Sequence, residues 1–241
     1  MSQPKLSRRE TITGLAASAV LPAIARATPA FARPASEAQA KALLDSFGDH
    51  LLRLSPEAAT SLGIDTGRRA SYRYRLGDRS AAGLHKAAAT LVSDLARAEA
   101  VDASALSFPT RTSLEVVHSA YRTALQGFAL PYGDVAVGGW RNTPYVVIQN
   151  VGAYIDTPQF LDTDHPVDNA ADAEAYLSRL AQYPAQLDGE LGRMRSARGK
   201  GLVPPVFLID KAIAQLTISA RSAATGVAGA RPWRWMATCR T

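Results

Sequence analysis

Apolar residues recur with helical spacing along much of the chain from about residue 36 onward. Leu43, Phe47 and Leu51 lie one turn apart and predict the apolar face of a helix that Ser36 can cap. Cap residues, a proline in a first turn and closing glycines mark the limits of the helices that follow. The predicted helices in the first half of the chain span about 36–54, 55–63, 80–100 and 110–126, and 65–79 is a polar connection.

The stretch at about 128–168 interrupts this pattern, because it is rich in glycine, proline and aromatic residues. Its apolar run at 146–148 is too short for periodicity to choose between a strand and a helical turn. Helices resume at about Asn169, a second segment opens at Pro184, and a last helix follows Pro204. The apolar positions of these three segments are Tyr176, Leu177 and Leu180, then Leu187, Leu191 and Met194, and finally Ile209, Ile213 and Leu216.

These segments predict an all-α fold, an irregular multi-helix assembly with an aromatic, Gly/Pro-rich connection at about 128–168. No strand alternation persists long enough to build a sheet, and no repeat is visible. The last helix, at about 205–224, is apolar on two sides, with Phe207, Ala214 and Ile218 on the second. A helix of this kind is normally buried between neighbours, so we expect it to expose apolar surface if its partner lies elsewhere.

The amino terminus, residues 1–32, has the charged start, apolar centre and small-residue end of an export signal. Its apolar part, 12–25, is about fourteen residues long, whereas a membrane-spanning helix needs about 20. Arg8 and Arg9 resemble the pair in a twin-arginine signal, although Thr11 to Thr13 depart from that pattern and leave a general secretion signal open. We expect cleavage after Ala32, no membrane span in the mature chain, the twin-arginine machinery as partner, and a periplasmic or extracellular location.

The net charge of +6 is confined to the two ends of the chain. Residues 33–220 carry 19 basic and 20 acidic side chains, so the basicity is not that of a nucleic-acid-binding face. A cluster of arginines with two interleaved tyrosines imitates a phosphate-binding patch, but Asp65 and Asp78 dilute it and we interpret it as a solvated connection. The arginines are Arg68, Arg69, Arg73, Arg75 and Arg79, and the tyrosines are Tyr72 and Tyr74. We expect no nucleic-acid partner.

No motif in the sequence carries catalysis or metal binding by itself. A hydrolytic zinc site commonly shows H-E-x-x-H, but none of the four histidines precedes a glutamate or lies within five residues of another. We interpret them as ordinary helix-face residues; they are His50, His85, His118 and His165. The acidic run at 162–174 lacks the glycine and glutamate of a calcium loop, so Asp168 and Asp172 are assigned to a helix start. The sequence therefore predicts no catalytic, cofactor-binding or metal-binding residue.

Several segments together resemble one family. They are Ser55 to Gly63, Arg75 to Ser80, His165-Pro166, Asp172 to Leu180, and Gly201 with Pro204-Pro205. Their order is similar to the amino-terminal part of the domain of unknown function 885 family, over about residues 37–225. That family is similar to helical zinc metallopeptidases of the gluzincin type. The resemblance implies a zinc site and a peptide ligand only in a longer protein, whose H-E-x-x-H motif lies in a carboxy-terminal half.

The chain contains no such motif, so we expect an amino-terminal fragment that is inactive alone. The alternative is a small periplasmic helical binding protein with its cleft at 128–168. Residues 226–241 abandon helical periodicity, contain Cys239 and no acid, and read either as an out-of-frame end or as a natural basic tail at a membrane surface. The predicted organisation is a signal at 1–32, a helical family portion at 33–225, and this tail.

We predict that changing Arg8 and Arg9 together to lysine stops export, because the twin-arginine machinery recognises the guanidinium pair rather than charge alone. A reporter fused to residues 1–35 measures this. Unchanged export of the double variant would leave only the general secretion route.

Overall fold

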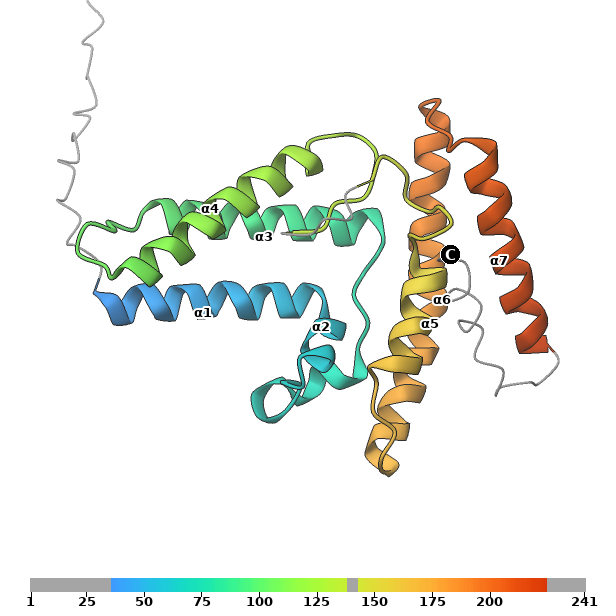
Figure 1. Ribbon diagram of the computed structural model, residues 1–241, viewed down its shortest axis with the longest axis horizontal. Coiled ribbons are helices and arrows are strands. Elements are labelled where there is room, and N and C mark those ends of the chain that lie inside the picture. The colour runs from blue at the N-terminus through green and yellow to red at the C-terminus, as the bar shows by residue number, and fades with distance from the viewer. Residues whose placement is uncertain (1–35, 138–142, 225–241) are drawn as a thin grey trace, which may run out of the picture. The chain divides into compact units, whose positions relative to one another are not determined.

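The computed structural model describes residues 36–137 and 143–224, and this part of the chain is mostly helical (Figure 1). The only extended pairings among these residues are two isolated bridges, Asp134 with Thr143 and Ile148 with Val151. The all-α prediction is confirmed. The helices are α1 (Glu37–Leu54), α2 (Pro56–Ser61), the 3₁₀ helix η1 (Gly67–Tyr74), α3 (Ala81–Glu99), α4 (Phe108–Phe128), α5 (Ala153–Thr163), α6 (Ala170–Gly199) and α7 (Val206–Ala224).

The predicted helix starts at Ser36, Ser80 and Asn169 are confirmed, since each of these side chains accepts a hydrogen bond from a first-turn N–H. At Ser36 the side chain of Gln39 also reaches back to the cap N–H and completes a capping box. Within the described part of the chain, no helix has the length and apolar character needed to cross a membrane.

The apolar core lies where α1, α3 and α4 pack together. Phe47, Leu91, Leu114 and Tyr121 come from these three helices and are almost fully buried. They occupy the stripes that periodicity predicts, which is the expected result for amphipathic helices that bury one face. Local pattern and tertiary packing agree in this part of the fold.

Three boundaries differ from the prediction. Helix α5 lies inside the stretch at 128–168, η1 lies inside the expected connection at 65–79, and α6 continues through Pro184. A proline inside a helix removes one backbone hydrogen bond, so a sequence pattern favours a break there. Tertiary contacts override it, because α6 is held on both sides of Pro184 by the buried side chains of Arg179 and Gln186.

Helix α6 buries a polar face and exposes an apolar one. Its buried residues lie at helical spacing and are mostly polar or charged: Asp172, Ala175, Arg179, Gln186, Glu190, Arg193 and Ala197. Four of the six apolar residues that the pattern identifies are instead exposed: Leu177 by 63%, Leu180 by 44%, Leu191 by 39% and Met194 by 38%. A core helix normally shows the reverse arrangement, so its buried groups must find partners on other elements.

Among the described residues, Arg179 is the largest side chain that is fully buried, with an exposed fraction of 0%. Its guanidinium donates to the carbonyls of Arg75 and Tyr72 at 3.0 Å and to Thr60 Oγ1 at 2.7 Å. It also donates to His165 Nδ1 at 2.6 Å and lies 4.8 Å from the centre of the Phe160 ring. One side chain thus joins α2, the η1 segment, α5 and the turn before α6.

The positive charge of Arg179 is balanced through neighbours rather than by a direct ion pair. Thr60 Oγ1 donates to Asp65 Oδ2 at 2.7 Å, and Arg73 bridges Asp65 and Asp172 at 3.1 and 2.5 Å. Burial lowers the pKa of Arg179 to about 10, although Glu57 and Asp65 oppose that shift. The segment at 65–79 is therefore not the solvated connection that its composition indicates, because Arg73 is half-buried between two carboxylates.

We predict that Arg179→Met lowers the free energy of unfolding by about 3–5 kcal/mol, because it leaves a hydroxyl, a histidine nitrogen and two carbonyls buried without their donor. Urea unfolding of the purified chain measures this. The exposed Arg111 is the control, and Arg111→Met should change stability by less than about 0.5 kcal/mol. Equal effects of the two substitutions would contradict the central place of Arg179.

Candidate functional site

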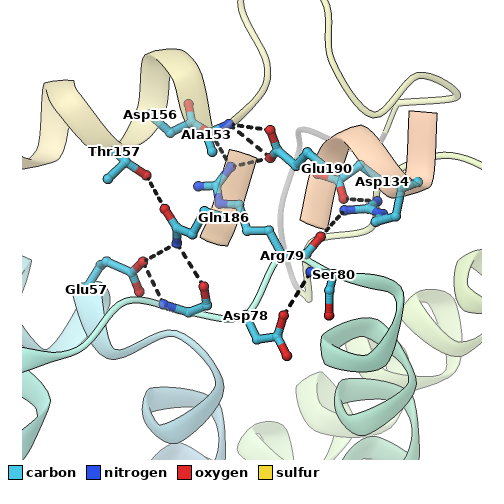
Figure 2. A network of polar contacts seen from close by, with 12 residues as sticks. Glu57, Asp78, Arg79, Ser80, Asp134, Ala153, Asp156, Thr157, Gln186 and Glu190 are labelled. Atoms are coloured by element: carbon cyan, nitrogen blue, oxygen red, sulfur yellow. Dashed lines mark hydrogen bonds and ion pairs between the residues drawn. The ribbon is translucent and has the colours of Figure 1, made fainter. Parts of the chain in front are cut away.

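Arg79, Asp156 and Glu190 form an ion-paired group, here called the Arg79 cluster (Figure 2). Arg79 comes from the segment before α3, Asp156 from α5 and Glu190 from the buried face of α6. One nitrogen of Arg79, Nη1, donates to Asp156 Oδ2 and to Glu190 Oε1, each at 3.1 Å. Burial acts against the Arg79 charge, but the two carboxylates raise its pKa overall. The cluster is thus a fixed cation between two anions.

Glu190 also sets the start of α5. Its two carboxylate oxygens accept the backbone N–H of Ala153 at 2.9 and 2.7 Å, in the first turn of that helix. An anion at a helix amino terminus is favoured by the unpaired N–H groups and by the helix dipole. Gly152 precedes it with φ 131°, and a Cβ there would lie 3.3 Å from Glu190 Oε2. Burial raises the pKa of Glu190, and Arg79 and Ala153 offset only part of that rise.

A second chain of hydrogen bonds runs from α5 to α2 through Gln186. Gln186 Oε1 accepts from Thr157 at 2.6 Å, and its Nε2 donates to the Gly77 carbonyl at 2.8 Å and to Glu57 Oε1 at 3.2 Å. The Gly77 N–H donates to the same Glu57 oxygen at 2.9 Å. The other oxygen, Glu57 Oε2, is buried and has no hydrogen-bond partner among the described residues. It is the unsatisfied acceptor of the site.

Arg193 and Gly189 hold the segment of Arg79 against α6. Arg193 donates to the Arg79 carbonyl at 3.3 Å, to the Gly133 carbonyl at 2.8 Å and to Asp134 Oδ1 at 2.6 Å. Gly189 lets the backbone of Ser80 approach, since a Cβ there would lie 2.8 Å from the Ser80 nitrogen. Helix α6 thus positions both the cation and the start of α3.

A cleft of about 470 Å³ lies beside these groups, here called the α2–α5 cleft. Its lining includes four carboxylates and one cation, namely Glu57, Asp78, Asp156, Asp164 and Arg79. Hydroxyl groups also line it, from Ser55, Ser61, Thr157 and Thr163. This surface offers hydrogen-bond acceptors and negative charge, so it suits ligands that carry N–H donors or a positive charge.

The histidines are not brought together. His50 on α1 lies 2.7 Å from Asp94 of α3, His85 lines a cavity beside α4, and His118 is partly buried on α4. The interpretation of His165 as a helix-face residue is wrong, because it is buried in the turn between α5 and α6. Among the described residues, no three His, Cys, Asp or Glu side chains are grouped so that they could hold a metal ion.

Other residues singled out in the sequence have clear locations or lie outside the described part of the chain. Asp172 is at the start of α6, as predicted, and pairs with Arg73. Arg68 and Arg69 both pair with Asp49 of α1. The export residues Arg8, Arg9 and Ala32, the tail at 226–241 and Cys239 lie outside the described residues.

Sequence reasoning missed Glu57, Gln186 and Glu190. A signal for two of them exists, because polar residues at 179, 186, 190 and 193 recur on one helix face, where a stripe of polar side chains flanks an apolar stripe. This pattern is ordinarily that of a solvated face, so periodicity alone does not identify it as buried.

Residues 56–233 match the family described as "Bacterial protein of unknown function (DUF885)". The chain belongs to this family. The match begins at the first residue of α2, includes the Arg179 contacts, the Arg79 cluster and all of the α2–α5 cleft except Leu54 and Ser55, and ends beyond α7. The first helix, α1, precedes it. No curated protein matches the sequence significantly.

The protonation state of His165 is fixed by its contacts. Since Arg179 donates to Nδ1, that nitrogen carries no proton, and Nε2 donates to the Asp172 carbonyl at 3.1 Å. Burial lowers the pKa of His165, and the nearby Arg179 and Arg73 charges act in the same direction. The unfolded chain therefore takes up a proton at a higher pH than the folded chain does.

We predict that this group contributes stability that is complete above pH ~6.5 and is lost as the pH falls toward the lowered pKa of the folded state. Between pH 7.5 and 5.5 the loss should reach up to about 1 kcal/mol in urea unfolding. His165→Asn keeps an acceptor for Arg179 without titrating, so its loss should be smaller, whereas His85→Asn should leave the loss unchanged. A loss that is identical in all three proteins would contradict the assignment.

Proposed function

We propose that this chain is a non-catalytic, peptide-binding part of an exported protein that is similar to zinc metallopeptidases. The family membership and the order of the resembling segments support this reading. Zinc and the two histidines of an H-E-x-x-H motif would belong to a carboxy-terminal half of such a protein, and the metal would supply an activated water there. The part described above would hold the substrate rather than cleave it.

The proposal rests on the residues that line the α2–α5 cleft. The cleft has four carboxylates, one ion-paired arginine and a buried Glu57 oxygen that lacks a donor. A buried acceptor without a partner is costly, and a ligand N–H or ammonium group would satisfy it. A peptide offers such groups along its backbone, at its amino terminus and on lysine or arginine side chains, so peptides with positive charge are the substrate class that this cleft favours.

Hydrogen bonds and ion pairs hold several side chains of the cleft in fixed orientations. Arg79 is held by Asp156 and Glu190, and Thr157 is held by Gln186, so these side chains are already oriented before a ligand arrives. Preorganised groups lose little conformational entropy on binding. Helix α5, which belongs to the stretch at 128–168, supplies one wall of the cleft.

Export through the twin-arginine route, directed by Arg8 and Arg9 with cleavage after Ala32, is part of the proposal. It would place the protein in the periplasm or outside the cell. A second candidate function is a small periplasmic helical binding protein. It would use the same cleft, to which the stretch at 128–168 contributes only residues at 156–164. The nucleotide sequence that follows the codon of Thr241 separates the two: an H-E-x-x-H helix encoded there, in any reading frame, supports the first.

We predict that a pentapeptide with two lysines binds the purified chain more tightly than its glutamate counterpart in isothermal titration calorimetry. Glu57→Gln should weaken binding of the lysine peptide about tenfold, because it removes the charge of the unsatisfied acceptor. Asp162 is on α5 but does not line the cleft, so Asp162→Asn is the matched control and should change affinity less than about twofold. Equal affinity for both peptides would contradict peptide binding at this cleft.

The proposed lack of catalysis is tested separately, by zinc content and peptide cleavage. We expect elemental analysis to find no stoichiometric zinc in the purified chain, and we expect no cleavage of either peptide, because no two histidines lie one helical turn apart. About one tightly held zinc per chain, with cleavage, would overturn it.

A further inference from the structure

The outer face of α6 carries apolar residues at the spacing of a helix-packing stripe. Leu177, Leu180, Leu187, Leu191 and Met194 follow one another every three or four residues, interrupted only at Pro184. This is the a/d spacing with which one helix packs along another. Leu177, Leu180, Leu191 and Met194 are exposed, whereas Leu187 is partly buried against the cluster of Tyr154, Ile155 and Ala212. The polar stripe that flanks these residues is the buried face of α6.

Helix α7 adds a second apolar wall. A groove of about 420 Å³ runs between the carboxy-terminal half of α6, α7 and the residues at 144–147, here called the α6–α7 groove. Leu191 and Met194 line one side, and Ile213 and Leu216 line the other with exposed fractions of 55% and 42%. The two helices are joined by a short connection and run antiparallel (Figure 1). The exposed apolar side chains of α6 and α7 form two ridges side by side, and a third helix can pack into the groove between them.

The charged side chains that line this groove are all positive. Arg195 and Arg198 line it, no acidic side chain does, and neither arginine forms an ion pair with a described residue. Carboxylates on an incoming segment would therefore find two cations without competition. The tail at 225–241 carries Arg231, Arg234 and Arg240 and no acid, so its charge has the wrong sign for this place.

We propose that the α6–α7 groove binds an amphipathic helix of a partner protein, whose apolar face packs on the two helices and whose carboxylates pair with Arg195 and Arg198. No residue lines both this groove and the α2–α5 cleft, so the inference is independent of peptide binding there. The groove is an interaction surface rather than a substrate site.

Two labelled synthetic helices test this, with the same leucine stripe and with either glutamates or lysines beside it. Fluorescence anisotropy with the purified full chain should show the glutamate helix binding roughly 5- to 30-fold more tightly at low salt, with the preference shrinking at 1 M salt. Changing Arg195→Gln and Arg198→Gln together should remove the preference and leave apolar binding. Ile213→Asn should weaken both helices.

The matched control changes two exposed arginines outside the groove, Arg53→Gln and Arg111→Gln, and should keep the preference. Equal binding of the two helices, or no binding of either, would overturn the proposal. So would a concentration-dependent dimer in sedimentation velocity that Ile213→Asn abolishes, since a second copy would then be the occupant. If removal of residues 225–241 makes the glutamate helix bind more tightly, the groove is occupied by the tail instead.

Discussion

The burial of one guanidinium governs much of this structure. Arg179 is fully buried, and its donors are used by backbone carbonyls, a hydroxyl and a histidine from three separate segments. A buried charge is tolerated only when its hydrogen bonds are satisfied and opposite charge lies near. Thr60 links it to Asp65, and Arg73 extends the network to the start of α6. The segments therefore have to meet at this point for the fold to form.

The same requirement decides which way α6 faces. With Arg179, Gln186, Glu190 and Arg193 turned inward, the apolar stripe of the helix is turned outward. Each buried group then positions something else: Glu190 starts α5, Gln186 links α5 to α2, and Arg193 holds the backbone of Arg79. The polar face thus builds the candidate cleft, and the apolar face supplies one wall of the proposed docking groove.

The site follows from this polar packing rather than from a motif. Its members, Glu57, Arg79, Asp156 and Glu190, are spread over more than a hundred residues of sequence and share no recognisable spacing. Each is a common residue type whose role depends on what lies opposite it. Family membership places the chain among bacterial proteins of unknown function, and the carboxylates that line the cleft are the basis of the proposed preference for cationic, N–H-rich ligands.

The sequence by itself determined the helical class, the cap positions and the core of α1, α3 and α4, because these depend on neighbours three or four residues apart. It also determined that Asp172 begins a helix. Only the tertiary structure decided that α5 begins after Gly152, that α6 continues through Pro184 and that the polar face of α6 is the buried one. Those outcomes depend on partners such as Glu190 and Arg179, which lie tens of residues away from the groups they satisfy. Periodicity depends only on residues that are close in sequence, so it predicted that the arginines at 65–79 are exposed to solvent. In the structure, Arg73 and Arg79 instead form ion pairs with carboxylates from distant segments.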